Sequence, residues 1–205
     1  MAISEEKPPE EQPLYGGRYE IKSVDSSTLP DGVIEAFDAE TRQLVHIKEL
    51  PELSESGDVE DFLPQAELVA RLKHQNLIRV MDFGTTESQI PFLVFEKFQG
   101  SNLFEYMQKN GRFKLKEGLE FCEKALEGID YLHSKGVMHG SLSLLNVHPF
   151  KELSFMPLNL KISGLLDIYP NEYHEYDDCE LPIEPFYSPE QLESEDVDFR
   201  SDVFS

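Results

Sequence analysis

Basic residues are scarce in this sequence, which has 18 lysines and arginines against 40 aspartates and glutamates in 205 residues. The resulting formal net charge of −22 repels phosphate backbones and anionic lipids, so we expect neither nucleic acid nor a membrane surface as a partner. The same charge favours a basic protein partner, although it is equally well explained by solubility alone.

Cysteines and long apolar runs are also rare. The two cysteines, Cys122 and Cys179, are too far apart for a metal-binding motif, which favours a reducing compartment with free thiols. No apolar run reaches the length of about 18 residues that a bilayer requires. Residues 1–6 lack the basic and apolar regions of a signal peptide. We therefore expect a cytoplasmic protein.

The order of local patterns predicts an α+β fold with two unequal lobes. Residues 1–17 are rich in glutamate and proline, which predicts a solvated tail. Strand patterns are found at 19–24, 32–38, 43–50, 77–83, 91–95, 144–147 and 158–162. Helical patterns are found at 60–73, 102–108 and 116–134. The expected lobes are residues 18–98 and 99–205.

The helix at 116–134 has the clearest periodicity of the chain. Its apolar residues recur at helical spacing, which predicts one apolar face formed by Leu119, Cys122, Leu126, Ile129 and Leu132. In a chain of these 205 residues alone, we expect Leu119, Leu126 and Ile129 on this face to be partly exposed. Gly136 follows at the position where a glycine commonly ends a helix.

Several short strings occur in the order and spacing found in protein kinases. They are Val45–Lys48, Leu93–Phe98, Tyr131–His139, Leu160–Ser163, Phe186–Glu190 and Ser201–Ser205. In this order the chain resembles the eukaryotic-type protein kinase domain from Tyr19 onward. The resemblance implies a bilobal fold with a small antiparallel β lobe and a mainly helical second lobe. The family's αF helix would begin at Asp202, so we expect an incomplete second lobe and a fragment of a longer protein.

The resemblance also assigns catalytic positions, and this chain does not fill them. The catalytic-loop aspartate position holds Ser141, which cannot act as a base near neutral pH. The metal-binding aspartate position holds Gly164, which offers Mg²⁺ no carboxylate. Gly140 replaces the arginine that receives an activation-loop phosphate, so activation by that route is not expected. The glycine positions of the phosphate loop hold Ser26, Thr28 and Asp31. We therefore expect no catalytic residue and no metal site.

Some nucleotide-binding positions remain under the same resemblance. They are Lys48, Gln65, Phe95, Glu96, Phe98 and Asn146. Gln65 stands where the family has a glutamate that pairs with the lysine, unless a shift in register lets Glu67 serve. His46 and His148 occupy the two positions that enclose adenine, and we expect the imidazoles to occlude this pocket, with stacking on adenine as the alternative.

The family's packing positions are kept. The resemblance implies that Val69, Val80, His139 and Leu165 lie in the core, and that His139 hydrogen-bonds the backbone.

The sequence thus predicts a pseudokinase, a kinase-like domain without catalysis or cofactor that acts as a protein-interaction or scaffolding module. The acidic segment Glu172–Glu180 is the predicted surface for a basic partner. Two alternatives remain open. One is an ATP-binding kinase with weak or atypical phosphotransfer that uses Mg²⁺, Lys48 and Asn146, and the other is a scaffold that binds ATP without turnover.

Overall fold

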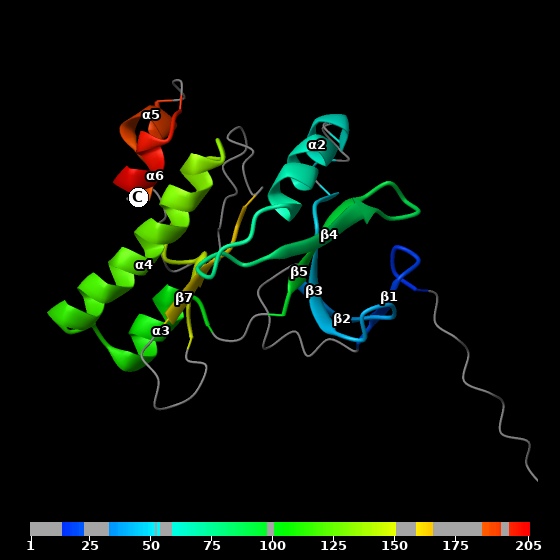
Figure 1. Cartoon of the computed structure of the whole chain (residues 1–205), viewed down its shortest axis with the longest axis horizontal. Helices are drawn as coiled ribbons and strands as arrows, with labels where there is room; N and C mark the ends of the chain where they lie inside the picture. The colour runs from blue at the N-terminus through cyan, green and yellow to red at the C-terminus, as the bar shows by residue number, and fades with distance from the viewer. Residues whose placement is uncertain are drawn as a thin grey trace, which may run out of the picture. The chain divides into compact units, whose positions relative to one another are not determined.

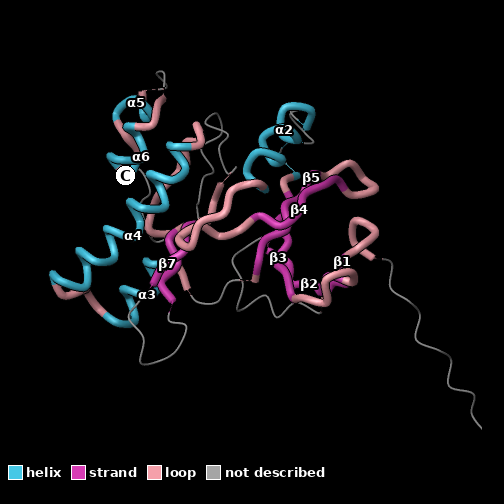
Figure 2. Tube along the Cα trace, viewed as in Figure 1, coloured by secondary structure: helices cyan, strands magenta, loops and turns pink. Residues whose placement is uncertain are grey.

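The computed structural model describes residues 14–22, 33–51, 53, 59–97, 101–150, 159–165, 186–193 and 197–205. The chain forms two compact units, one from residues 1–63 and 81–97 and the other from residues 64–80 and 98–205. Figures 1 and 2 show their helices and strands. Of the tail predicted at residues 1–17, only residues 14–17 are described. Within the described residues, no helix is both long and apolar enough to cross a membrane.

The first unit is built on a five-stranded sheet with the order β1-β2-β3-β5-β4. The strands are β1 (Tyr19–Ile21), β2 (Val33–Asp38), β3 (Leu44–Glu49), β4 (Val80–Thr85) and β5 (Pro91–Glu96). β2 pairs antiparallel with β1 and β3, and β3 pairs antiparallel with β5. The five strands predicted in this region are confirmed, with bounds that differ by a few residues.

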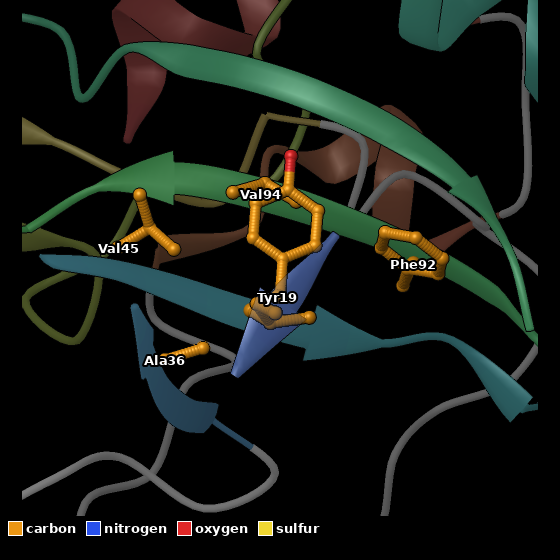
Figure 3. Packing of buried hydrophobic residues seen from close by; sticks show 6 residues of the cluster. Tyr19, Ala36, Val45, Phe92 and Val94 are labelled. Carbon is orange, nitrogen blue, oxygen red and sulfur yellow. The ribbon is translucent and has the colours of Figure 1, made fainter. Parts of the chain in front are cut away.

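One face of this sheet carries the core of the first unit. Strand side chains alternate between faces, so β3 and β5 each contribute every second residue. Figure 3 shows Val45, Phe92 and Val94 gathered around the ring of Tyr19. The centroid of the Phe92 ring lies 5.1 Å from that of Tyr15 and 6.5 Å from that of Tyr19, both edge to face. The other positions of β3, Leu44, His46 and Lys48, point to the opposite face of the sheet.

Polar contacts join the strand ends of the first unit. Arg18 binds Asp38 with two hydrogen bonds of 2.7 and 2.9 Å, and its third nitrogen donates to Asp82 Oδ2 at 3.0 Å. The Tyr19 hydroxyl donates to Asp82 at 2.6 Å, and the Tyr15 hydroxyl donates to Glu49 at 2.6 Å. The Arg18 guanidinium holds the pKa of Asp38 well below its usual range. These contacts tie β1 to the ends of β2 and β4.

The second unit contains most of the helices and a two-stranded antiparallel sheet. Its elements are the greater part of α2 (Val59–Ala70), α3 (Leu103–Asn110), α4 (Leu115–Ser134), β6 (Val147–Phe150), β7 (Asn159–Ile162), α5 (Pro189–Leu192) and α6 (Arg200–Phe204). The strand predicted at 144–147 begins later, because the Asn146 side chain accepts a hydrogen bond from Ser143 N and holds these residues in a turn.

The apolar face of α4 is exposed in part, as expected for Leu119 and Leu126, whereas Ile129 is buried. Leu119 and Leu126 are 62% and 56% exposed, and Cys122 is also exposed. The buried residues of α4 are Phe121, Gly128, Ile129 and Leu132. The contact face passes through Gly128, where an added Cβ would lie 3.3 Å from Ile162 Cδ1 and 3.4 Å from Asn76 Cβ. A glycine that brings a helix close to its neighbour carries no hydrophobic signal in the sequence.

Two further predictions for this unit are confirmed. The helix ends before Gly136, which has φ of +73° and donates its backbone N–H to His133 O. The packing positions are all buried, namely Val69, Val80, His139 and Leu165. The fold is therefore α+β, with a small β-rich unit and a mainly helical one, as the sequence predicts.

Candidate functional site

The lysine predicted to contact nucleotide lies on the face of the first unit's sheet opposite the core around Tyr19. On β3, Val45 and Ile47 point into the core, and His46 and Lys48 therefore point to the opposite face. The register places Phe95 of β5 beside His46. Three predicted site residues, His46, Lys48 and Phe95, thus share one face. Glu96 lies opposite Val45 in the register, so its position belongs to the other face of the sheet. Phe98 lies outside the described residues.

Glu35 is a member of this face that the sequence analysis missed. It lies directly opposite His46 in the β2–β3 register. Its Oε2 accepts a 2.7 Å hydrogen bond from Lys97 Nζ and lies 3.9 Å from His46 Nε2. The bond from Lys97 lowers the pKa of Glu35, and burial lowers the pKa of His46. Only the strand register reveals Glu35, because nothing in its local sequence sets it apart from the other acids.

This face presents a neutral, buried imidazole where the kinase resemblance expects a small alanine. His46 is 1% exposed, and Phe95 beside it is also buried. His46 and Phe95 are therefore two ring side chains that lie side by side on this face.

Gln65, the remaining predicted partner of Lys48, lies in α2 with an exposed side chain. Its neighbour Ala66 is buried with Phe62 and Val69, which form the contact face of this helix. Glu67, the alternative to Gln65, forms an exposed ion pair with Arg71 one turn later.

The loop that contains Ser141 is held by its own polar groups. Asn146 donates its side-chain amide to Ser141 O, and its Oδ1 accepts a 2.9 Å hydrogen bond from Ser143 N. Leu145 N donates to Ser143 Oγ at 3.2 Å. The buried Ser141 hydroxyl has no hydrogen-bond partner among the described residues. The retained asparagine shapes the loop through both ends of its amide.

His148 and Gly164 lie close to this loop in the second unit. His148 is buried on β6, and its Nε2 lies 2.8 Å from Ser163 Oγ. Burial lowers the pKa of His148 to about 4, so the ring is neutral near pH 7. Gly164 follows Ser163 with φ of +84°, a left-handed conformation that glycine adopts without strain.

The donor set of this loop does not suit Mg²⁺. The segments 137–150 and 159–165 contain no aspartate or glutamate. Amide, hydroxyl and imidazole groups alone are a poor substitute for the carboxylates that this hard cation prefers. Among the described residues, no group of three or more His, Cys, Asp or Glu side chains is placed to hold a metal ion. The residues present therefore fit neither the divalent ion nor the general base of phosphoryl transfer.

A buried carboxylate nearby, Asp202, serves the backbone instead. Its Oδ1 accepts from Gly140 N at 2.7 Å, and its Oδ2 accepts from His139 N at 2.8 Å and lies 2.7 Å from His133 Nε2. The His139 ring reaches the backbone at Ser163 O, 2.7 Å away, which confirms the role predicted for it. Asp202 is fully occupied in holding the loop, and its role could not be read from the sequence because its partners lie more than 60 residues away.

The sequence matches the family described as "Protein tyrosine and serine/threonine kinase" over residues 23–205. It is 24% identical over 202 residues to "Probable serine/threonine-protein kinase PknB" of Bifidobacterium longum, a match that covers 94% of this chain and 29% of that protein. It is 36% identical over 76 residues to "CBL-interacting protein kinase 31" of Oryza sativa subsp. japonica, which covers 37% of this chain and 17% of the rice protein. The chain thus spans less than a third of the length of either relative.

The fold is similar to that of Rad53 residues 1–466, whose crystal structure was solved in complex with AMP-PNP. The TM-score is 0.61 at 20% identity, and the match covers 73% of this chain and 38% of the Rad53 chain. This likeness concerns the fold alone.

Proposed function

Because the chain belongs to the protein tyrosine and serine/threonine kinase family, we propose that it is a kinase-like domain that transfers no phosphate and acts by binding another protein. The observation that carries this proposal is the chemistry of the loop 137–150 with the turn at 159–165. Phosphoryl transfer needs carboxylates to hold Mg²⁺ and to receive the proton of the acceptor hydroxyl. Ser141 and Gly164 stand at those two positions and supply neither.

The nucleotide face supports the same conclusion. Bound ATP would bring an adenine, a ribose and a chain of negative phosphates that Lys48 and the metal ion must neutralise. In this proposal the rings of His46 and Phe95 take up the space for adenine on this part of the sheet, and the carboxylate of Glu35 beside His46 is engaged by Lys97. His148, buried in the second unit, is the other imidazole of the proposed occlusion.

Architecture without catalytic chemistry favours a role in recognition. The packing residues are buried as in an intact domain, and Asp202 holds the loop backbone although the loop lacks its catalytic groups. The net charge of −22 makes a basic protein partner the best electrostatic match, and a scaffold in the cytoplasm is part of this proposal. The acidic segment Glu172–Glu180, which the sequence predicts as the binding surface, lies outside the described residues.

A weak ATP-binding kinase remains the second candidate, because Lys48 and Asn146 are retained. In that function Lys48 would contact the phosphates, and the Asn146 oxygen would offer one neutral ligand to Mg²⁺. The Asn146 oxygen already accepts Ser143 N at 2.9 Å, which argues against this use.

Thermal denaturation with ATP and Mg²⁺ separates the two candidates. We expect millimolar ATP with Mg²⁺ to shift the melting temperature by less than about 1 °C, and no γ-phosphate to reach a generic protein substrate. Lys48→Ala should then melt in ATP as it does in buffer. A stabilisation of several degrees that disappears in Lys48→Ala would support the ATP-binding candidate, and phosphate transfer would overturn the proposal.

His46→Ala supplies a matched gain-of-function variant. Removing the imidazole opens space beside Phe95 on the sheet, so weak binding of adenosine without Mg²⁺ is the expected result. Val45→Ala, one residue earlier on the core face, is the control and should bind no adenosine. Equal adenosine binding by the two variants would refute occlusion by His46. Neither variant supplies the missing catalytic groups, so neither should transfer phosphate.

A further inference from the structure

The turn between α3 and α4 concentrates positive charge in an otherwise acidic chain (Figure 1). Residues 109–116 contain four of the 18 lysines and arginines of the sequence, and residues 106–116 contain no aspartate or glutamate. All four basic side chains are exposed, namely Lys109, Arg112, Lys114 and Lys116. The charge on this turn is therefore opposite in sign to that of the chain as a whole, whose formal net charge is −22.

Two exposed leucines lie beside these basic residues. Leu115, the first residue of α4, is 81% exposed, and Leu119 one turn later is 62% exposed. Residues four positions apart lie on the same side of a helix, so the two side chains form one apolar strip. The strip begins between Lys114 and Lys116, so charge and apolar surface meet at one place. An exposed apolar patch with a charged rim is typical of a protein–protein contact.

Aromatic packing and a backbone bond hold the turn in place. The ring of Phe113 stacks on Tyr106 of α3 and on Phe121 of α4, with centroid distances of 5.6 and 5.2 Å. Gly111 N donates to Met107 O at 2.8 Å and closes the end of α3. A partner that binds the turn therefore pays little for ordering its backbone.

We propose that the turn at residues 109–116 and the strip of Leu115 and Leu119 bind an acidic segment of another protein that carries apolar side chains. The carboxylates of this segment contact the basic side chains of the turn, and its apolar side chains cover the two leucines. This partner is distinct from the basic one that the net charge favours. The inference holds whether or not the chain transfers phosphate.

The charges around the turn favour a narrow partner. Glu105, Glu117 and Glu120 are exposed and flank the turn on α3 and α4. An anionic membrane is a broad surface that would meet these carboxylates as well as the lysines, whereas a single segment can lie along the basic residues alone. A second copy of this chain would bring a further net charge of −22, which opposes self-association.

Fluorescence anisotropy of a labelled peptide tests this surface on the complete chain. The probe is a helical peptide of about 15 residues, with leucines along one face and glutamates on the other. We expect it to bind, and Lys114→Glu should weaken binding about five- to tenfold because an attraction becomes a repulsion. Lys73→Glu makes the same charge change at another exposed lysine of the second unit. This control should bind the peptide as the wild type does.

Leu115→Ser tests the apolar strip. Losing one leucine contact should weaken peptide binding about tenfold. Leu126→Ser also removes an exposed leucine of α4, about three turns later, and should leave binding unchanged. Because each variant replaces an exposed side chain, its far-ultraviolet circular dichroism should match that of the wild type.

The outcomes that overturn the proposal are distinct. One is no peptide binding at about 1 mM, and another is an equal loss in a variant and its control. Binding to vesicles of phosphatidylserine and phosphatidylcholine in place of the peptide would assign the turn to a membrane surface. A dimer in sedimentation that is lost in Lys114→Glu would assign the turn to a second copy of this chain.

Discussion

Replacing Asp202 by asparagine should destabilise the second unit, because this carboxylate is buried and accepts bonds from two backbone N–H groups. Asparagine has nearly the same shape but only one accepting oxygen. Either His139 N or Gly140 N, now 2.8 and 2.7 Å from a carboxylate oxygen, would face an amide NH₂ group. Losing one charge-assisted bond and leaving one buried donor unpaired costs about 2–4 kcal/mol.

Urea unfolding followed by far-ultraviolet circular dichroism measures this cost. At a slope of about 2–3 kcal/mol per molar urea, the midpoint of Asp202→Asn should fall by about 1 M. Asp198→Asn is the matched control, since Asp198 lies four residues earlier and forms an exposed ion pair with Arg200 at 2.7 Å. Its midpoint should change little, because solvent screens exposed ion pairs and they contribute little to stability. Equal midpoints for Asp202→Asn and the control would refute the role of Asp202 as the anchor of this loop.

Two further predictions concern acid stability. Burial lowers the pKa of His148 to about 4, so the unfolded chain binds this proton first and stability falls as the pH drops from about 6.5 to about 4. Between these two pH values, the free energy of unfolding measured in urea should fall by about 3 kcal/mol less in His148→Leu than in the wild type. An identical pH profile for the two proteins would show that His148 does not cause the loss of stability. Arg18 lowers the pKa of Asp38 in the folded chain. The pair therefore contributes its full share of stability above the unfolded pKa of about 3.9, and this share is lost as the pH falls toward the lower pKa of the folded state. Asp38→Asn should therefore melt below the wild type at neutral pH and approach it in strong acid, whereas a constant difference would exclude this pair as its cause.

The sequence predicted the strands of the sheet because strand patterns are local. Once β3 is assigned, the positions of His46 and Lys48 on one face and of Val45 and Ile47 on the other follow from a period of two. The end of α4 was predictable for a similar reason, because Gly136 adopts a backbone conformation that few other residues accept.

Features that depend on distant partners could not be predicted. The ion pair between Glu35 and Lys97 requires the register of β2 as well as the end of β5. The contact of α4 with Asn76 and Ile162 passes through Gly128, which adds nothing to the apolar pattern of the helix. The role of Asp202 depends on the backbone N–H groups of His139 and Gly140, which carry no residue-specific signal in the sequence.

The hydroxyls of Tyr15 and Tyr19, each bonded to a carboxylate, give the first unit its own optical probes. The chain contains no tryptophan, so its near-ultraviolet absorption comes mainly from tyrosine. Burial and these carboxylates raise the pKa of both phenols above the ordinary value of 10.0. In an alkaline titration these two rings should stay un-ionised until the strands around them separate. A late rise in phenolate absorbance would then record the opening of this sheet without any label.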